Sequence, residues 1–98
     1  MAKFLILWEL DTTRVPESPE EQMIFFKRLM NMVDIDFKSG MIDWGEFVGG
    51  HTGYAINEGT EQDLSLILMK YSPYIKFKVH PVLSAVQIEE NMKALSQA

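Results

Sequence analysis

The sequence predicts an α+β domain in which four strands and two helices follow one another in the order βαββαβ, with a third helix at the end. Four segments show the alternating pattern or the β-branched and aromatic content of strands. They are residues 3–10, 41–48, 51–57 and 74–80. Helix-start signals follow the first and the third of these segments. The length of 98 residues is common for one domain, so we expect a single domain over residues 1–98.

The first strand is expected over residues 3–10, because this segment, KFLILWEL, is rich in leucine, isoleucine and aromatic residues. Ser18 and Pro19 then predict a helix start, since serine caps helices well and proline suits the first helical position. The helix should end near Phe37, where a lysine, a serine and a glycine follow. Its expected buried stripe is Phe26, Leu29, Met30 and Val33.

The second and third strands are expected over residues 41–48 and 51–57, as a hairpin. Gly49-Gly50 lies between them, and such a pair is typical of tight turns. Thr60 then predicts the start of a second helix, with Asp63 in the capping-box position. The two strands are therefore followed directly by a helix.

The fourth strand is expected over residues 74–80, where apolar and polar residues alternate, and Pro81 should end it. Ser84 and Gln87 form a further candidate capping box. The residues after them have helical apolar spacing, so a short amphipathic helix should close the chain.

This order of elements is the ferredoxin-like arrangement. Right-handed crossovers place the first strand between the third and the fourth, antiparallel to both, with helices on one face. The other face then carries Leu5 and Leu7, which are poor residues to leave in water. Covering such apolar area is favourable by ~25 cal/mol per Å². We therefore expect Leu5 and Leu7 in the interface of a homodimer or higher homo-oligomer that packs sheet on sheet.

The composition favours a cytoplasmic protein that binds neither nucleic acid nor a membrane. The net charge is −5 and the 9 basic residues are scattered, whereas phosphate binding needs a basic cluster. The apolar run at residues 4–8 is too short for a signal peptide, and no run approaches the ~18 residues of a membrane span. There is no cysteine, and no close histidine and acidic spacing suggests zinc. We expect no metal and no cofactor.

The second half of the chain combines a tryptophan, a valine–glycine pair, a tyrosine-containing strand, an acidic–leucine helix and a final Val-x-Pro. These residues are Trp44, Val48, Gly49, Tyr54, Ile56, Glu61, Asp63, Leu64, Leu68, Pro73, Tyr74, Val79 and Pro81. The set resembles the muconolactone isomerase family. The resemblance implies a dimeric α+β barrel, in which two ferredoxin-like sheets pair face to face. Such barrels include isomerases, cofactor-free oxygenases, haem proteins and stress proteins, so fold does not choose one chemistry.

Glu9 and His51 are the candidate catalytic residues, because the topology brings both to the same end of the sheet. With Leu7 opposite Lys76, Glu9 on the open face would lie near Tyr74 and Lys76 and could act as a general base. The alternative is a strand-end surface carboxylate paired with a lysine. His51 could serve as an acid or base, or it could simply be the histidine at the end of a hairpin.

Six residues are candidate ligand contacts, namely Trp44, Glu46, Tyr54, Tyr74, Lys76 and Lys78. Binding pockets are mostly apolar and aromatic with a few polar groups, which suits Trp44 and Tyr54. Both fit the core or a dimer contact as well. Lys76 and Lys78 share the polar face of the fourth strand and could hold an anionic ligand. Lysines on an edge strand also prevent aggregation.

These features predict a homodimeric small-molecule-binding domain whose ligand is small and partly apolar or anionic. If the protein is an enzyme, we expect isomerase-type, metal-free proton transfer with Glu9 as the base. His51, Tyr54 or Lys76 would then orient the substrate. The alternative is a non-catalytic assembly protein whose open sheet serves only oligomerisation. A haem protein would need His51 or His80 as an axial ligand.

Overall fold

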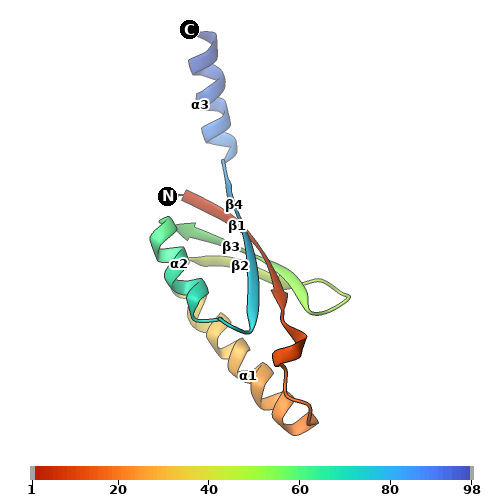
Figure 1. Cartoon of the computed structure of the whole chain (residues 1–98). Coiled ribbons are helices and arrows are strands. Elements are labelled where there is room, and N and C mark those ends of the chain that lie inside the picture. Colours follow the sequence, from red (N-terminus) through yellow and green to blue (C-terminus); the bar gives the residue numbers. More distant parts are fainter. Residues whose placement is uncertain (1, 98) are drawn as a thin grey trace.

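The computed structural model describes residues 2–97 and shows an α+β fold with one open antiparallel sheet. Its elements are β1 (Ala2–Leu10), the 3-10 turn η1 (Thr12–Arg14), α1 (Pro19–Asp36), β2 (Met41–Glu46), β3 (Thr52–Gly59), α2 (Glu61–Met69), β4 (Ile75–Val82) and α3 (Ala85–Ser96). The four strands have the order β2-β3-β1-β4 (Figure 1). The predicted sequence of elements is confirmed, and the fold is compatible with a ferredoxin-like arrangement.

β1 is a central strand of the sheet, paired with β3 and β4 and antiparallel to both. Its inward side chains face the side on which α1 and α2 lie (Figure 1). Val33 of α1, Leu64 of α2 and Tyr71 after α2 complete the core. Four inward side chains of β1 are at most 7% exposed, namely Phe4, Ile6, Trp8 and Leu10. The other side of the sheet, with Leu5 and Leu7, is called the open face below.

The three predicted helix starts are confirmed in atomic detail. A side-chain oxygen of Ser18, Thr60 and Ser84 accepts a hydrogen bond from the backbone N–H three residues later, at 3.1, 3.0 and 3.2 Å. At α3 the Gln87 side chain also accepts from the backbone N–H of Ser84, which completes a capping box. The sequence predicts these helix starts correctly because a cap depends only on residues that are close together in the chain.

The hairpin between β2 and β3 is wider than the predicted tight turn. β2 ends two residues earlier than expected and β3 begins at Thr52, so residues 47–51 form the loop. Phe47 donates to the carbonyl of Thr52 and accepts from the N–H of Gly50, both at 2.8 Å. Gly50 and His51 take positive φ angles of 82° and 66°, a left-handed backbone that favours glycine. The prediction that His51 opens the third strand is therefore wrong.

The predicted end of the fourth strand at Pro81 is also wrong, because β4 continues to Val82. Pro81 stays in register, opposite Phe4 of β1. β4 is an edge strand, and an edge strand accommodates a residue that lacks a backbone N–H. Only Leu83 and Ser84 then connect β4 to α3.

The predicted buried stripe of α1 is wrong in part. Val33 is 5% exposed, but Phe26 and Met30 are 37% and 43% exposed. The reason is the length of α1, since its 18 residues span about 27 Å and its N-terminal part extends past the sheet (Figure 1). The turns near the C-terminal end make the contact, and there Asp36 is buried beside Val33.

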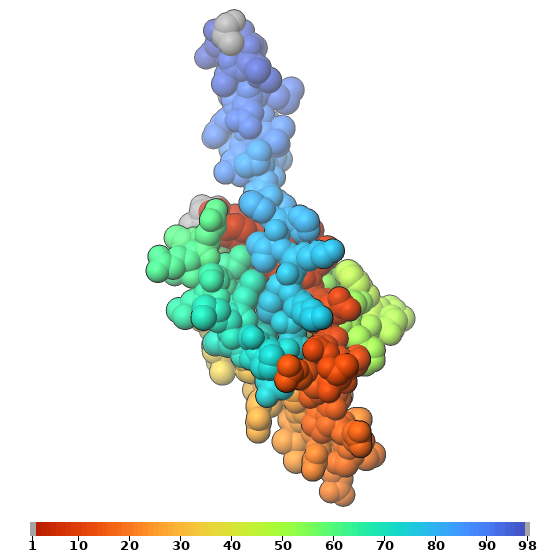
Figure 2. Space-filling model, in the orientation of Figure 1, coloured from red at the N-terminus to blue at the C-terminus, as the bar shows by residue number. Residues whose placement is uncertain are grey.

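The C-terminal helix α3 stands apart from the rest of the domain (Figures 1 and 2). The described chain measures 63 × 25 × 18 Å along its principal axes, and α3 forms one end of the long axis. No described residue of α3 is buried. No helix within residues 2–97, α3 included, is long and apolar enough to cross a membrane.

Candidate functional site

The pairing of β1 with β4 decides which predicted site residues meet on the open face. Glu9 lies opposite Thr52 on one side and Lys76 on the other, and Leu7 lies opposite Tyr54 and Lys78. The expected register of Leu7 with Lys76 is therefore wrong by two residues. The shift leaves both lysines on the open face, because a slip of two residues preserves the side to which a side chain points.

A shallow groove of about 420 Å³ lies at the Glu9 end of the open face. It gathers four of the predicted residues, namely Leu7, Glu9, Lys76 and Lys78. The remaining lining comes from Trp8, Phe47, Thr52, Gly53 and Phe77. We call this the open-face groove. It holds one carboxylate and two ammonium groups beside apolar side chains, in a protein whose net charge is −5.

Six of the predicted residues lie outside this groove, and two of them, His51 and Tyr74, lie near the Glu9 end of the sheet. The carbonyl of His51 accepts a hydrogen bond from the N–H of Leu10 at 2.8 Å, which fixes the loop at the Glu9 end of the sheet. The His51 side chain is exposed and does not line the groove. Tyr74 precedes β4, and its ring meets that of Phe25 in α1 edge to face, with centroids 5.3 Å apart. Tyr74 is therefore placed with α1.

Tyr54 lies on the open face with its hydroxyl already engaged. The hydroxyl donates to a carboxylate oxygen of Asp43 at 2.9 Å. This hydrogen bond raises the pKa of Tyr54, with smaller contributions from burial and from the charge of Asp43. Gly45 leaves room for the ring, because a Cβ there would stand 2.5 Å from Cε1 of Tyr54. Tyr54 is thus held in one position beside the groove residue Phe47, with ring centroids 6.4 Å apart.

Trp44 and Glu46 lie on the opposite, helix-covered side of the sheet. The ring of Trp44 stacks on that of Trp8 with centroids 5.5 Å apart and planes inclined by 6°. The Trp8 Nε1–H donates to the carbonyls of Gly45 and Tyr54 at 3.2 and 3.3 Å. The sheet therefore separates Trp44 and Glu46 from Glu9, Lys76 and Lys78. These residues were predicted from the sequence as contacts of one ligand, and they lie on two faces.

The tryptophan pair lines a second space, a crevice of about 100 Å³ between α1 and the sheet. Its walls are almost entirely apolar, from Ile6, Leu29, Val33 and Phe77 among others. Three acidic or amide side chains also reach it, and these are Asp36, Glu46 and Asn57. We call it the helix-side crevice. Apolar walls with a few polar groups are the usual lining of a small-molecule site, but such sites are commonly about 300–1,000 Å³, so this crevice holds only a small group unless it widens.

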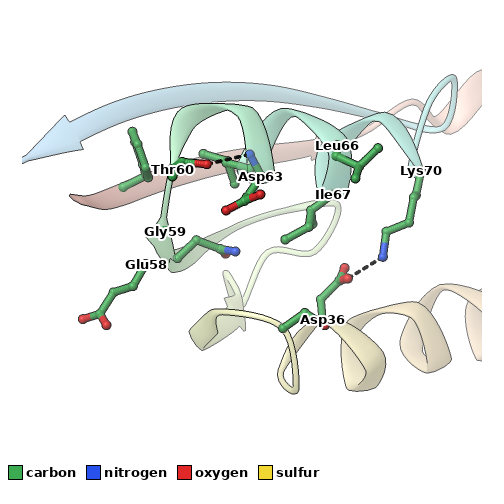
Figure 3. Close-up of a pocket in the computed structure, with 12 residues that line it drawn as sticks. Asp36, Glu58, Gly59, Thr60, Asp63, Leu66, Ile67 and Lys70 are labelled. Carbon is green, nitrogen blue, oxygen red and sulfur yellow. Dashed lines mark hydrogen bonds and ion pairs between the residues drawn. The ribbon is translucent and has the colours of Figure 1, made fainter. Parts of the chain in front are cut away.

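Asp36 is the most unusual polar residue of the structure, because its side chain is fully buried, with 0% exposure. Lys70 Nζ lies 2.5 Å from its Oδ1, and the Tyr71 hydroxyl donates to its Oδ2. Burial and the neighbouring carboxylate raise the pKa of Tyr71 well above its usual range. Figure 3 shows Asp36 pointing from α1 towards Lys70, at the edge of an open pocket into which Asp63 also points.

Sequence reasoning missed Asp36, although a signal was present. Asp36 follows Val33 by three residues and therefore shares its face of α1. An acidic residue on an apolar helical face needs a buried partner, and here the partners come from 34 and 35 residues further along the chain.

The two histidines lie at opposite ends of the sheet. His51 adjoins Thr52, which faces Glu9, whereas His80 pairs with Leu5. No group of three or more potential metal ligands occurs among the described residues 2–97.

No model of a known protein family matches this chain, and no curated protein is similar to it. The resemblance to muconolactone isomerase therefore stays a prediction from the residues that suggested it.

Proposed function

We propose that the protein is a homodimeric small-molecule-binding domain in which two open faces pack together as a dimeric α+β barrel. The observation that carries the proposal is the apolar centre of the open face. Leu7, on a central strand, is 36% exposed, and on the same face Leu5, two residues earlier in β1, pairs with Ile56 of β3. A monomer would keep this apolar row in water, at a cost of ~25 cal/mol per Å². A second copy covers it by a two-fold contact in which each face meets its equivalent.

The ligand of this dimer would lie in the open-face groove, closed by the facing sheet. Two ammonium groups, on Lys76 and Lys78, outnumber the single carboxylate of Glu9. The groove is therefore suited to an anion, and the walls from Leu7 and Phe47 suit an apolar body. A small carboxylate with an apolar skeleton combines both properties.

Glu9 is the group in the groove that can accept a proton from such a ligand. Lys76 stands directly opposite Glu9 across the β1–β4 pair and would hold the anionic end of the ligand. A carboxylate base beside an ammonium group that binds the substrate is an arrangement that would support metal-free proton transfer of the isomerase type. Tyr54 and His51 would support this site from its edge, the former through its bond to Asp43.

The helix-side crevice is a second candidate position for a ligand. It is more enclosed by apolar side chains than the groove, and two of the predicted contacts, Trp44 and Glu46, line it. The chain has only two tryptophans, and both line this crevice. A ligand bound there should change tryptophan emission strongly. The emission of a Trp44→Phe variant would show how much of that change comes from Trp44.

The competing function is assembly without a ligand. The same apolar residues would then fill the space between two sheets and leave no groove. The two functions predict the same dimer and differ in the groove, so a binding measurement separates them. Small carboxylates should bind the wild-type protein and bind at least ~10-fold more weakly to a Lys76→Gln, Lys78→Gln double variant, since each lost charged hydrogen bond costs about 1.5–3 kcal/mol. Lys38→Gln is the matched control, because Lys38 is exposed after α1. Equal binding by both variants would place the ligand outside the open-face groove, and no binding by the wild-type protein would leave assembly as the function.

The dimer is tested first by light scattering on size-exclusion fractions. The wild-type protein should have at least twice the mass of one chain, and Leu7→Lys should reduce that mass. Leu66→Lys is the control, because Leu66 is 68% exposed on α2, away from the open face. A wild-type monomer at tens of micromolar, or an unchanged mass for Leu7→Lys, would refute the proposed packing.

A further inference from the structure

The helix α3 carries an apolar stripe that has no partner within the described chain. Ile88, Met92 and Leu95 share one side of the helix and are 44%, 63% and 78% exposed. Ala85 extends the stripe to the first turn. Helices of 12 residues are only marginally stable alone in water, and most of their stability in proteins comes from packing an apolar face. α3 therefore needs a surface to cover this stripe.

A matching surface exists on the same chain, between α2 and β4. It is a groove of about 550 Å³, which we call the α2–β4 groove. Leu64 forms a buried part of it, whereas Met69 and Val79 are 69% and 40% exposed. Most of the other lining is also apolar, and includes Phe4, Leu68, Ile75, Phe77 and Pro81. The groove follows β4 for about 20 Å, and α3 is about 18 Å long.

The connection between β4 and α3 leads the helix away from the groove of its own chain. Val82 is still paired with Lys3 of β1, and only Leu83 and Ser84 follow before α3. Ser84 has extended backbone angles of φ −73° and ψ 164°. The chain consequently continues outward, and α3 points away from the sheet (Figure 1).

We propose that α3 of one copy packs into the α2–β4 groove of a second copy, and that the exchange is reciprocal. A two-fold axis near Leu83 would lay each α3 beside the β4 of the other chain, because β4 and α3 follow one another outward in Figure 1. Both halves of the contact belong to one chain, so two copies satisfy each other and the assembly closes. A different protein would cover only one of the two surfaces.

This contact does not depend on the proposed sheet packing. The α2–β4 groove contains Phe77 and Val79, which lie opposite Trp8 and Ile6 and so share the helix-covered side of the sheet. The two self-contacts therefore use opposite sides of the molecule. A protein with both would form an assembly larger than a dimer, which closes as a tetramer if the two two-fold axes cross at right angles, and a protein with the helix exchange alone would form a dimer.

Engineered cysteines provide the test, because the chain contains none. Two single variants, Met92→Cys on the stripe and Met69→Cys on the groove, carry different tags and are mixed under mild oxidation. A disulfide needs Cα atoms about 4.4–6.8 Å apart, so only docked copies should link quickly. Val86→Cys is the matched control, because Val86 is 61% exposed on a different side of α3. We expect the mixed disulfide of Met92→Cys to form at least tenfold faster than that of Val86→Cys.

Two results would overturn the exchange. The first is equal linking rates for the Met92→Cys and Val86→Cys variants. The second is an internally linked monomer as the main product of a Met92→Cys, Met69→Cys double variant at low concentration, since α3 would then occupy its own groove. A Met92→Glu variant gives independent support if the mass of its assembly in solution, measured by light scattering, is lower than that of the wild type. The Val86→Glu variant should keep the wild-type mass, and both variants should keep the wild-type circular dichroism. Loss of mass in Leu7→Lys alone, with the Met92 link retained, would show that sheet packing and helix exchange are separate contacts.

Discussion

The two faces of β1 are made of alternate residues of one strand, and they differ in what covers them. Ile6 is 1% exposed beneath α1 and α2, whereas its neighbour Leu7 is 36% exposed on the open face. The indole N–H of Trp8 donates to two backbone carbonyls of neighbouring strands, those of Gly45 and Tyr54. Glu9, in contrast, is exposed and lies opposite Lys76. One face is completed by the chain's own helices. The other is left uncovered by the chain's helices and combines apolar residues such as Leu7 with the charged side chains of Glu9 and Lys76.

The difference in burial predicts very different costs for two adjacent truncations. Ile6→Ala should lower the free energy of unfolding by about 2–5 kcal/mol, because it removes a fully buried side chain and leaves a cavity. Leu7→Ala should cost less than about 1 kcal/mol in a dilute, monomeric sample. Urea unfolding at two protein concentrations measures both.

The same pair also tests the dimer. If Leu7 lies between two sheets, the cost of Leu7→Ala should grow as protein concentration rises, because dimerisation stabilises the wild type. A cost that does not depend on concentration would indicate that the open face is free in solution.

The buried carboxylate of Asp36 provides the next largest effect on the helix-covered side. Asp36→Ala would leave the Tyr71 hydroxyl buried without an acceptor and Lys70 without its partner. We expect a loss of about 2–3 kcal/mol in the free energy of unfolding, since a buried unsatisfied donor costs about 1–3 kcal/mol. Asp34→Ala is the control, because Asp34 is exposed on the same helix. An equal, small loss for both variants would mean that the Asp36 contacts contribute little.

The tryptophan pair depends on a glycine on the neighbouring strand. A Cβ at Gly53 would lie 2.1 Å from the carbonyl oxygen of Gly45 and 2.4 Å from Cζ2 of Trp8. Gly53→Ala should therefore cost about 1–3 kcal/mol and change tryptophan emission. Gly49→Ala should change neither, because a Cβ at Gly49 meets nothing within 4 Å. Similar stability and emission for the two variants would contradict the crowding at Gly53.

The sequence predicted the elements well because their signals are local. Ser18, Thr60 and Ser84 cap their helices through bonds that span three residues, and the alternation in β1 assigns each side chain to a face. Errors appeared at element ends. The loop at residues 47–51 is longer than its glycines suggested, and β4 extends past Pro81 because it is an edge strand.

The candidate site was less predictable because it depends on tertiary structure. The register of β1 with β4 places Lys78 beside Leu7, and no local pattern specifies such a pairing. The sheet separates Trp44 from Glu9, so the two residues line different spaces, although the sequence predicted both for one ligand site. Asp36 was missed because its partners, Lys70 and Tyr71, follow the C-terminal end of α2 and are 34 and 35 residues away in the sequence. Even so, alternation alone placed Glu9, Lys76 and Lys78 on one face.

The smallest expected effect is a loss of stability at alkaline pH. It distinguishes the two faces because each carries one tyrosine with a raised pKa. The pKa of Tyr71 is raised chiefly by burial, and that of Tyr54 chiefly by its hydrogen bond to Asp43. The unfolded chain ionises its tyrosines near pH 10, whereas a tyrosine with a raised pKa stays protonated in the folded state. The free energy of unfolding is therefore unaffected below about pH 10 and decreases as the pH rises above it. Wild-type stability should therefore fall above pH 10, by at most about 1.4 kcal/mol per pH unit for Tyr71.

Tyr71→Phe should remove most of this alkaline loss, and Tyr54→Phe should remove little of it. Tyr71 is only 5% exposed, whereas Tyr54 is partly exposed and loses less solvation when it ionises. Urea unfolding between pH 9 and pH 11 measures the slope for each protein, with Tyr74→Phe as a control for an exposed tyrosine. If Tyr54→Phe flattened the slope as much as Tyr71→Phe, the assignment of the larger alkaline loss to the buried Tyr71 would be wrong.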